Sequence, residues 1–198
     1  MTEKRTRKNQ KKKIRGRAAA PVRLRNRKKG IKTVLVVLFI VMLNIGCDQG
    51  TKDLARKRIR HQGTINVVGS LVILRYAEND GAFLSIGSRM PQPYKTILLV
   101  IFPIMIVIGS LLYISLNRGL SLLQTACLSS IIGGGISNIF DRILYNGMVT
   151  DFLNFGIGPV RTGILNCADL SITLGAVLLV ILQYWKERTR PARSRSIK

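Results

Sequence analysis

The chain has 198 residues, of which 32 are Lys or Arg and nine are Asp or Glu, and 47% of its residues are hydrophobic. Charge and apolar content occupy different segments: residues 1–32 carry 15 basic residues, residues 186–198 carry six, and residues 33–185 carry 11 with seven acidic ones. A disordered or nucleic-acid-binding chain would lack such long apolar runs, and a water-soluble enzyme of this length could not bury them. The composition indicates one apolar domain with two basic tails.

Cysteine and histidine usage excludes two further classes of protein. Cys47, Cys127 and Cys167 are odd in number and far apart in the chain, unlike the cysteines of a disulfide framework. His61 is the only histidine, so the usual ligand spacing of a zinc site is absent. We therefore expect no metal site and no disulfide-rich scaffold.

Four apolar stretches are candidates for membrane-spanning helices. A helix needs about 20 mostly apolar residues to cross the hydrocarbon core, and in lipid each segment has to satisfy its own backbone polar groups. The second stretch is long enough to cross by itself, and the first is long enough if it continues past Cys47. The last two can cross if their polar residues face other helices. Pro103 should kink the second helix without ending it. The stretches are about 33–47, 94–116, 120–140 and 165–185.

The third stretch also carries small residues at a spacing of four, which places them on common helical faces. Small side chains let neighbouring helices approach closely in a membrane. We therefore expect close packing on two faces of this helix. The two sets are Ser129, Gly133 and Ser137, and Ala126, Ser130 and Gly134.

The distribution of Lys and Arg predicts the orientation in the membrane. The basic residues before the first span favour a cytoplasmic N-terminus, and four spans return the basic C-terminus to the same side. The smaller basic cluster at 56–60 would then lie outside, at the outer lipid surface. We predict a disordered basic cytoplasmic tail at 1–30, a four-helix membrane domain at 31–186 and a basic cytoplasmic tail at 187–198.

The fold class expected is an all-α membrane protein with four transmembrane helices and a small extracytoplasmic β-hairpin or sheet. The hairpin is predicted from two β-type runs, 64–68 and 71–77, separated by Gly69 and Ser70. The basic tails should contact anionic phospholipid headgroups, or serve only to set the topology. No nucleic-acid partner is expected.

This topology gathers acidic and amide side chains near one face of the membrane. Two carboxylates held close at low dielectric share a proton, so that one can act as a base and the other as an acid. Spacing pairs Asp48 with Lys52 and directs Asn166 and Asp169 to one point. Spacing alone leaves open aspartyl hydrolysis, a proton or ion path, and paired structural charges. The groups are Asp48, Asn79, Asn138, Asp141, Asp151, Asn166 and Asp169.

Four motifs, in this order and at these positions relative to the spans, resemble those of the lipoprotein signal peptidases, or signal peptidase II. Each motif is weak alone, but four in order are specific, and the resemblance covers about residues 33–185. The segments are DQGTK at 48–52, NDGAF at 79–83, GGGISNIFDR at 133–142 with GMVTDF at 147–152, and NCAD at 166–169.

The resemblance implies an intramembrane aspartyl endopeptidase of the bacterial cytoplasmic (inner) membrane, with its active site near the outer face. It would remove signal peptides from diacylglyceryl-modified prolipoproteins, cutting before the lipid-modified Cys, as a monomer and without a cofactor. The catalytic pair would be Asp151 and Asp169, with Asp141 structural or supporting. Substrate-binding or supporting residues would be Asp48, Lys52, Asn79, Gly81, Asn138, Asp141, Arg142, Asn166 and Ala168.

Three alternatives are compatible with the sequence. The first is a small proton- or ion-coupled transport protein that uses the same acids as a relay. The second is a divergent, inactive paralogue of the peptidase, since Ser137 and Leu165 depart from the family pattern. The third is that the protein is itself a lipoprotein modified at Cys47, which the three spans that follow disfavour.

Overall fold

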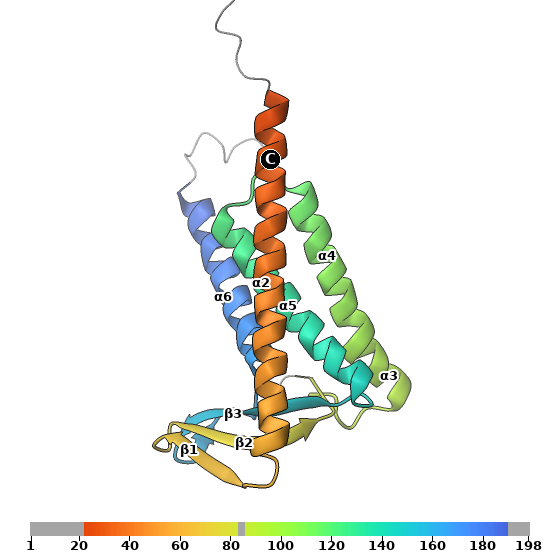
Figure 1. Cartoon of the computed structure of the whole chain (residues 1–198), viewed down its shortest axis with the longest axis vertical. Coiled ribbons are helices and arrows are strands. Elements are labelled where there is room, and N and C mark those ends of the chain that lie inside the picture. Colours follow the sequence, from red (N-terminus) through yellow and green to blue (C-terminus); the bar gives the residue numbers. More distant parts are fainter. Residues whose placement is uncertain (1–21, 83–85, 190–198) are drawn as a thin grey trace, which may run out of the picture. The chain divides into compact units, whose positions relative to one another are not determined.

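The computed structural model describes residues 22–82 and 86–189, which form four long helices and a small sheet (Figure 1). All four helices are long and apolar enough to cross a membrane, over residues 30–58, 92–116, 122–144 and 167–188. The predicted fold class is therefore confirmed. The helical elements are α2 (Val22–Arg58), α3 (Gln92–Thr96), the π-helical turn η2 (Ile97–Ile101), α4 (Phe102–Leu116), α5 (Leu122–Leu144) and α6 (Cys167–Arg188).

The chain divides into two units, residues 1–35 and 36–198. Of the first unit, the structure describes the helical residues 22–35. The predicted tail at 1–30 therefore overlaps the start of α2, because Arg, Lys and Leu are good helix formers and extend the helix beyond its apolar part. Residues 1–21 and 190–198, which make up most of the two predicted tails, lie outside the described residues.

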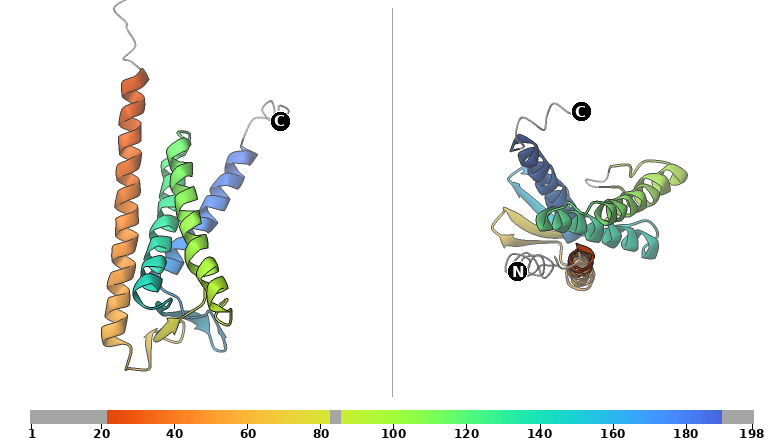
Figure 2. Two further views of the ribbon diagram at one scale, coloured as in Figure 1. Left: turned by 90° about the vertical axis from the view of Figure 1, so that its right-hand side faces the viewer. Right: turned by 90° about the horizontal axis from the view of Figure 1, so that it is seen from above.

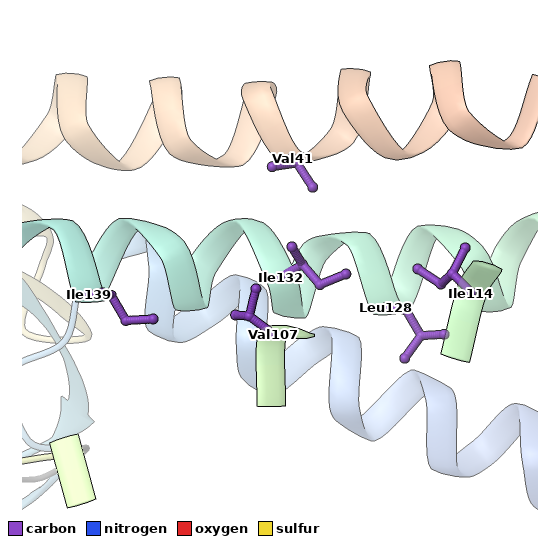
Figure 3. Packing of buried hydrophobic residues seen from close by; sticks show 6 residues of the cluster. All are labelled: Val41, Val107, Ile114, Leu128, Ile132 and Ile139. Carbon is purple, nitrogen blue, oxygen red and sulfur yellow. The ribbon is translucent and has the colours of Figure 1, made fainter. Parts of the chain in front are cut away.

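Within the second unit, α5 packs against both α4 and α6 (Figure 2). One apolar cluster joins α2, α4 and α5 (Figure 3), and its members are at most 9% exposed. Most other apolar side chains on these helices are exposed, as expected of surfaces that face lipid rather than water. The cluster consists of Val41, Val107, Ile114, Leu128, Ile132 and Ile139.

Two glycines of α5 bring its neighbours close, as the spacing of small residues predicts. A Cβ on Gly133 would lie 2.7 Å from Asn44 Cβ of α2, and a Cβ on Gly134 would lie 2.6 Å from the carbonyl oxygen of Ala168 in α6. These glycines therefore let α5 pack closely against α2 on one face and against α6 on the other.

Pro103 lies near the start of α4 and does not end the helix, which runs continuously from Gln92 to Leu116. Proline has no N–H to donate to the carbonyl of Leu99, one turn earlier. The preceding turn, η2, adopts π-helical hydrogen bonding instead. The sequence predicts a kink at this proline. The structure shows a π-helical turn on its N-terminal side.

The sheet is antiparallel, with strand order β1-β2-β3-β4, and lies across one end of α5 and α6 (Figure 1). Its strands are β1 (Thr64–Val68), β2 (Val72–Asn79), β3 (Val149–Ile157) and β4 (Val160–Arg161). The hairpin of β1 and β2 is as predicted, but the sequence did not indicate β3 and β4. Residues 149–152 of β3 are all buried, so the strand lacks the alternation of apolar and polar residues that marks a half-exposed strand.

Candidate active site

Asp151 and Asp169 lie on different elements and line the same cavity. Asp151 is on β3, where it pairs with Ala77 of β2, and Asp169 is in the first turn of α6. The cavity has a volume of about 500 Å³ and is walled mainly by apolar side chains of α4, α5 and α6. The structure thus brings together two carboxylates that are 18 positions apart in the sequence. Polar residues of the lining are Asn79, Asn138, Arg142, Asp151, Asn166, Asp169 and Thr173.

Two asparagines hold the Asp151 carboxylate, which is only 1% exposed. Its Oδ1 accepts a 2.7 Å hydrogen bond from Nδ2 of Asn166, and its Oδ2 accepts a 2.9 Å bond from Nδ2 of Asn79. Each carboxylate oxygen has a second lone pair, which remains available to water or substrate. Asp151 is therefore fixed in orientation and has no ion-pair partner within the described residues.

Asn166 also holds Asp169, because it caps α6. Its Oδ1 accepts a 2.9 Å hydrogen bond from the backbone N–H of Asp169, and its own N–H donates a 3.3 Å bond to Oδ2 of Asp169. The two side chains thus form a reciprocal capping box, which the sequence did not predict; it predicted only that they are directed to one point. A single asparagine thus positions both carboxylates.

Asn138 on α5 completes the contacts of Asp169 by donating a 2.9 Å hydrogen bond to its Oδ1. The Oδ1 of Asn138 accepts from Nζ of Lys52 at 2.9 Å and from Nδ2 of Asn166 at 3.2 Å. Because the lysine can only donate, it requires the oxygen of the Asn138 amide to face it. The Nδ2 group of Asn138 is consequently directed toward Asp169.

The Lys52 ammonium is fully buried, and its three N–H groups have three acceptors. Besides Asn138, it binds Oδ2 of Asp48 at 2.6 Å and Oδ2 of Asp141 at 3.1 Å. The i, i+4 pairing of Asp48 with Lys52 is as predicted. Asp48 further accepts hydrogen bonds from Oγ of Ser137 at 2.7 Å and from the N–H of Ala168 at 2.8 Å. The Asp48 side chain thus joins α2 to α5 and α6.

Asp141 faces away from the cavity and into this ion-pair network. Its Oδ1 accepts from Nε2 of Gln49 at 2.9 Å and from Arg56 at 3.1 Å. Asp141 is therefore already paired by Lys52 and Arg56, and it is not among the residues that line the cavity. The geometry separates it from Asp151 and Asp169, and its structural or supporting role stays a prediction.

Two members of this network were not predicted from the sequence. Gln49 lies inside the DQGTK motif, and its place in that motif was the only feature of the sequence that pointed to it. Arg56 was assigned with its basic neighbours to the lipid surface, but it binds Asp141, donates to Oγ1 of Thr150 at 2.9 Å, and stacks on the ring of Tyr145. The buried negative charge of Asp141 attracts this one member of the cluster inward.

Hydrogen bonds to Asn79 and from Arg142 hold Gly81, just after β2. Oδ1 of Asn79 accepts from the N–H of Gly81 at 2.9 Å, and Nη2 of Arg142 donates to the carbonyl of Gly81 at 2.6 Å. Nε of Arg142 is buried and, within 22–82 and 86–189, is the one buried side-chain nitrogen or oxygen without a hydrogen bond. The arginine thus retains an unused donor at the cavity wall.

Burial, reinforced by the nearby Asp169 carboxylate, raises the pKa of Asp151 from 3.8 to about 6. The hydrogen bonds from Asn79 and Asn166 and the charge of Lys52 act in the opposite direction. Asp151 is therefore protonated in mildly acidic conditions, where an exposed aspartate would be ionised. A carboxyl group with this property can serve as an acid or share a proton with its neighbour.

The chain matches a known family over most of its length. The family described as signal peptidase (SPase) II matches residues 40–185. A lipoprotein signal peptidase of Halothermothrix orenii is 31% identical over 154 residues, which cover 78% of this chain and 96% of the relative. One from a Sulfurihydrogenibium species is 33% identical over 159 residues, covering 79% and 96%.

Solved structures show the same fold. A bacterial membrane enzyme determined at 2.3 Å resolution has a TM-score of 0.65 and 25% sequence identity, and the match covers 80% of this chain and 90% of that one. A second bacterial membrane enzyme, determined at 1.9 Å, has a TM-score of 0.63 at 24% identity, covering 77% and 92%. The four helices and the sheet at their end therefore recur in other membrane enzymes.

Proposed function

The chain belongs to the signal peptidase II family, and we propose that Asp151 and Asp169 are the catalytic carboxylates of its reaction. It is an aspartic endopeptidase that removes the signal peptide from a diacylglyceryl-modified prolipoprotein, cutting before the lipid-modified cysteine. The assignment rests on one observation: Asn166 donates a hydrogen bond to each of the two carboxylates, both of which line one cavity.

The mechanism is direct attack by water. One carboxylate of the pair is ionised and removes a proton from the water, while the other is protonated and donates to the carbonyl oxygen or the leaving amine. The raised pKa of Asp151 supports a pair that holds a single proton near pH 6. No covalent intermediate is required, and the pair returns to its starting state once the protons have been exchanged.

The surrounding donors orient the pair and the scissile peptide. Asn138 and Asn166 fix the directions of the carboxylates, so that their free lone pairs face the cavity. Arg142 also lines the cavity, and its guanidinium can donate to a peptide carbonyl that enters it. Positioning of this kind converts a bimolecular hydrolysis into a reaction between prearranged groups.

The rest of the cavity suits an apolar peptide segment. Leu98, Phe102 and Ile106 line it from η2 and α4, and Ile139 and Ile172 line it from α5 and α6. The wall residues belong to helices long enough to span the membrane, so a lipid-anchored substrate can enter sideways from the bilayer. The apolar part of a signal peptide is the segment that such walls would hold.

The same proposal includes the setting of the enzyme. The basic residues at both ends favour cytoplasmic termini, in the bacterial inner membrane, with the catalytic pair near the outer face. The tails would bind anionic phospholipid headgroups. We propose that the enzyme acts as a monomer.

The test is cleavage of a lipid-modified precursor by the purified protein and by D151N and D169N. Either substitution removes one carboxylate and should abolish cleavage, while D53N should cleave normally because Asp53 is exposed and pairs only with Lys57. Cleavage by D151N or D169N at the normal rate would refute the catalytic pair. An inactive wild-type protein that is folded would instead favour the inactive-paralogue alternative.

A further inference from the structure

Cys47 and Cys167 are 120 positions apart in the sequence but adjacent in the fold. Asp48, the residue after Cys47, accepts a 2.8 Å hydrogen bond from the N–H of Ala168, the residue after Cys167. The part of α2 around Asp48 and the start of α6 are therefore in direct contact.

The side chain of Thr51 contacts both cysteines. Its Oγ1 lies 2.8 Å from the carbonyl oxygen of Cys47, one helical turn earlier, and 3.4 Å from Sγ of Cys167. Thr51 therefore contacts the main chain of Cys47 and the thiol of Cys167. Cys47 is exposed and Cys167 half-buried, whereas the third cysteine, Cys127, is buried elsewhere in α5.

We propose that Cys47 and Cys167 form an oxidation site, at which a disulfide ties the outer part of α2 to the N-terminus of α6. The reaction is thiol–disulfide exchange with a small-molecule or protein disulfide. One cysteine thiolate attacks the disulfide of the reagent, forms a mixed disulfide with one half of it and releases the other half as a thiol. The second cysteine then attacks the mixed disulfide and displaces the remaining half as a second thiol. The sulfur–sulfur bond of the reagent breaks, the Cys47–Cys167 bond forms, and both protons end on the reduced reagent.

The position of this bond links it to the catalytic pair. Cys167 lies between Asn166 and Ala168, in the capping turn that holds Asp169. Because Asp48 already binds the N–H of Ala168, a cross-link at the neighbouring positions fixes a contact that the fold makes without it. We therefore expect the disulfide to stabilise this turn and to leave the enzyme active.

The experiment is oxidation of the purified full-length protein with oxidised glutathione, followed by intact-mass measurement and peptide mapping. The wild type should lose about two hydrogen atoms in mass, gain no glutathione and yield one linked peptide pair. C127A is the matched control and should behave like the wild type. C47A and C167A should form at most a mixed disulfide with glutathione.

Thermal unfolding gives a second measurement that does not depend on catalysis. The oxidised wild type and C127A should unfold at a temperature several degrees higher than their reduced forms, and C47A should show no such difference. Three outcomes would overturn the proposal: glutathione attached separately at both sites, a dimer linked between chains, or cysteines that do not react. None of these outcomes bears on the catalytic carboxylates.

Discussion

Oδ1 of Asp151 accepts a 2.7 Å hydrogen bond from Nδ2 of Asn166, the residue that caps the helix carrying the second carboxylate. The cap of α6 is therefore also part of the proposed catalytic arrangement. A change in the α6 cap should move the two carboxylates relative to each other. A change in the cap of another described helix should not have this effect.

Replacement of Asn166 by Ala should lower kcat far more than it lowers stability. The loss of a helix cap costs about 1 kcal/mol, whereas misplacement of a catalytic group costs about 100-fold in rate. Ser121 provides the control, because it caps α5 with the same kind of capping box, through Gln124. S121A should lose a similar amount of stability and keep its kcat. Equal losses of kcat in the two variants would contradict the positioning role of Asn166.

The pH dependence of cleavage should report the proton shared by the pair. With the pKa of Asp151 at about 6, loss of this proton leaves no acid, so kcat/KM should fall as the pH rises above this value, by about tenfold per pH unit. The hydrogen bond from Asn79 lowers this pKa, so N79A should raise it and shift the alkaline limb to higher pH. A shift to lower pH in the profile of N79A would contradict the assignment.

Two lysine–aspartate pairs on α2 should differ sharply in their contribution to stability. Both are i, i+4 pairs with a distance of 2.6 Å, but Lys52 and Asp48 are fully buried, whereas Lys57 and Asp53 are more than half exposed. K52M leaves buried carboxylates uncompensated and should cost about 3–5 kcal/mol in the free energy of unfolding. K57M should cost less than about 1 kcal/mol. Denaturant titration of the two variants in the same detergent measures the difference.

Helix packing gives a further matched pair of substitutions. G134A places a Cβ 2.6 Å from the carbonyl of Ala168, which is backbone and cannot rotate away. We expect a loss of about 1–3 kcal/mol in the free energy of unfolding, and reduced activity because the first turn of α6 is displaced. In G46A the new Cβ meets nothing within 4 Å, so this variant should be as stable as the wild type or up to about 1 kcal/mol more stable. Thermal unfolding and cleavage assays on both variants test this contrast.

The sequence by itself determined the four spans, because a segment that crosses lipid has to be apolar and helical over a fixed length. It also determined that the acids gather at one end, since alternate crossings bring the span ends to the same level. The hairpin of β1 and β2 and the pairing of Asp48 with Lys52 followed from local periodicity, which involves residues close together in the chain.

Only the tertiary structure decided how the acids differ from one another. Asp141 binds Lys52 and Arg56, across 85 positions or more of the chain, whereas Asp151 and Asp169 at the cavity have no ion-pair partner in the part of the chain that the structure describes. The strands β3 and β4 likewise depend on pairing with distant residues. Such contacts depend on which helix surfaces pack against each other. The pattern of residues that are neighbours in the chain does not encode that packing.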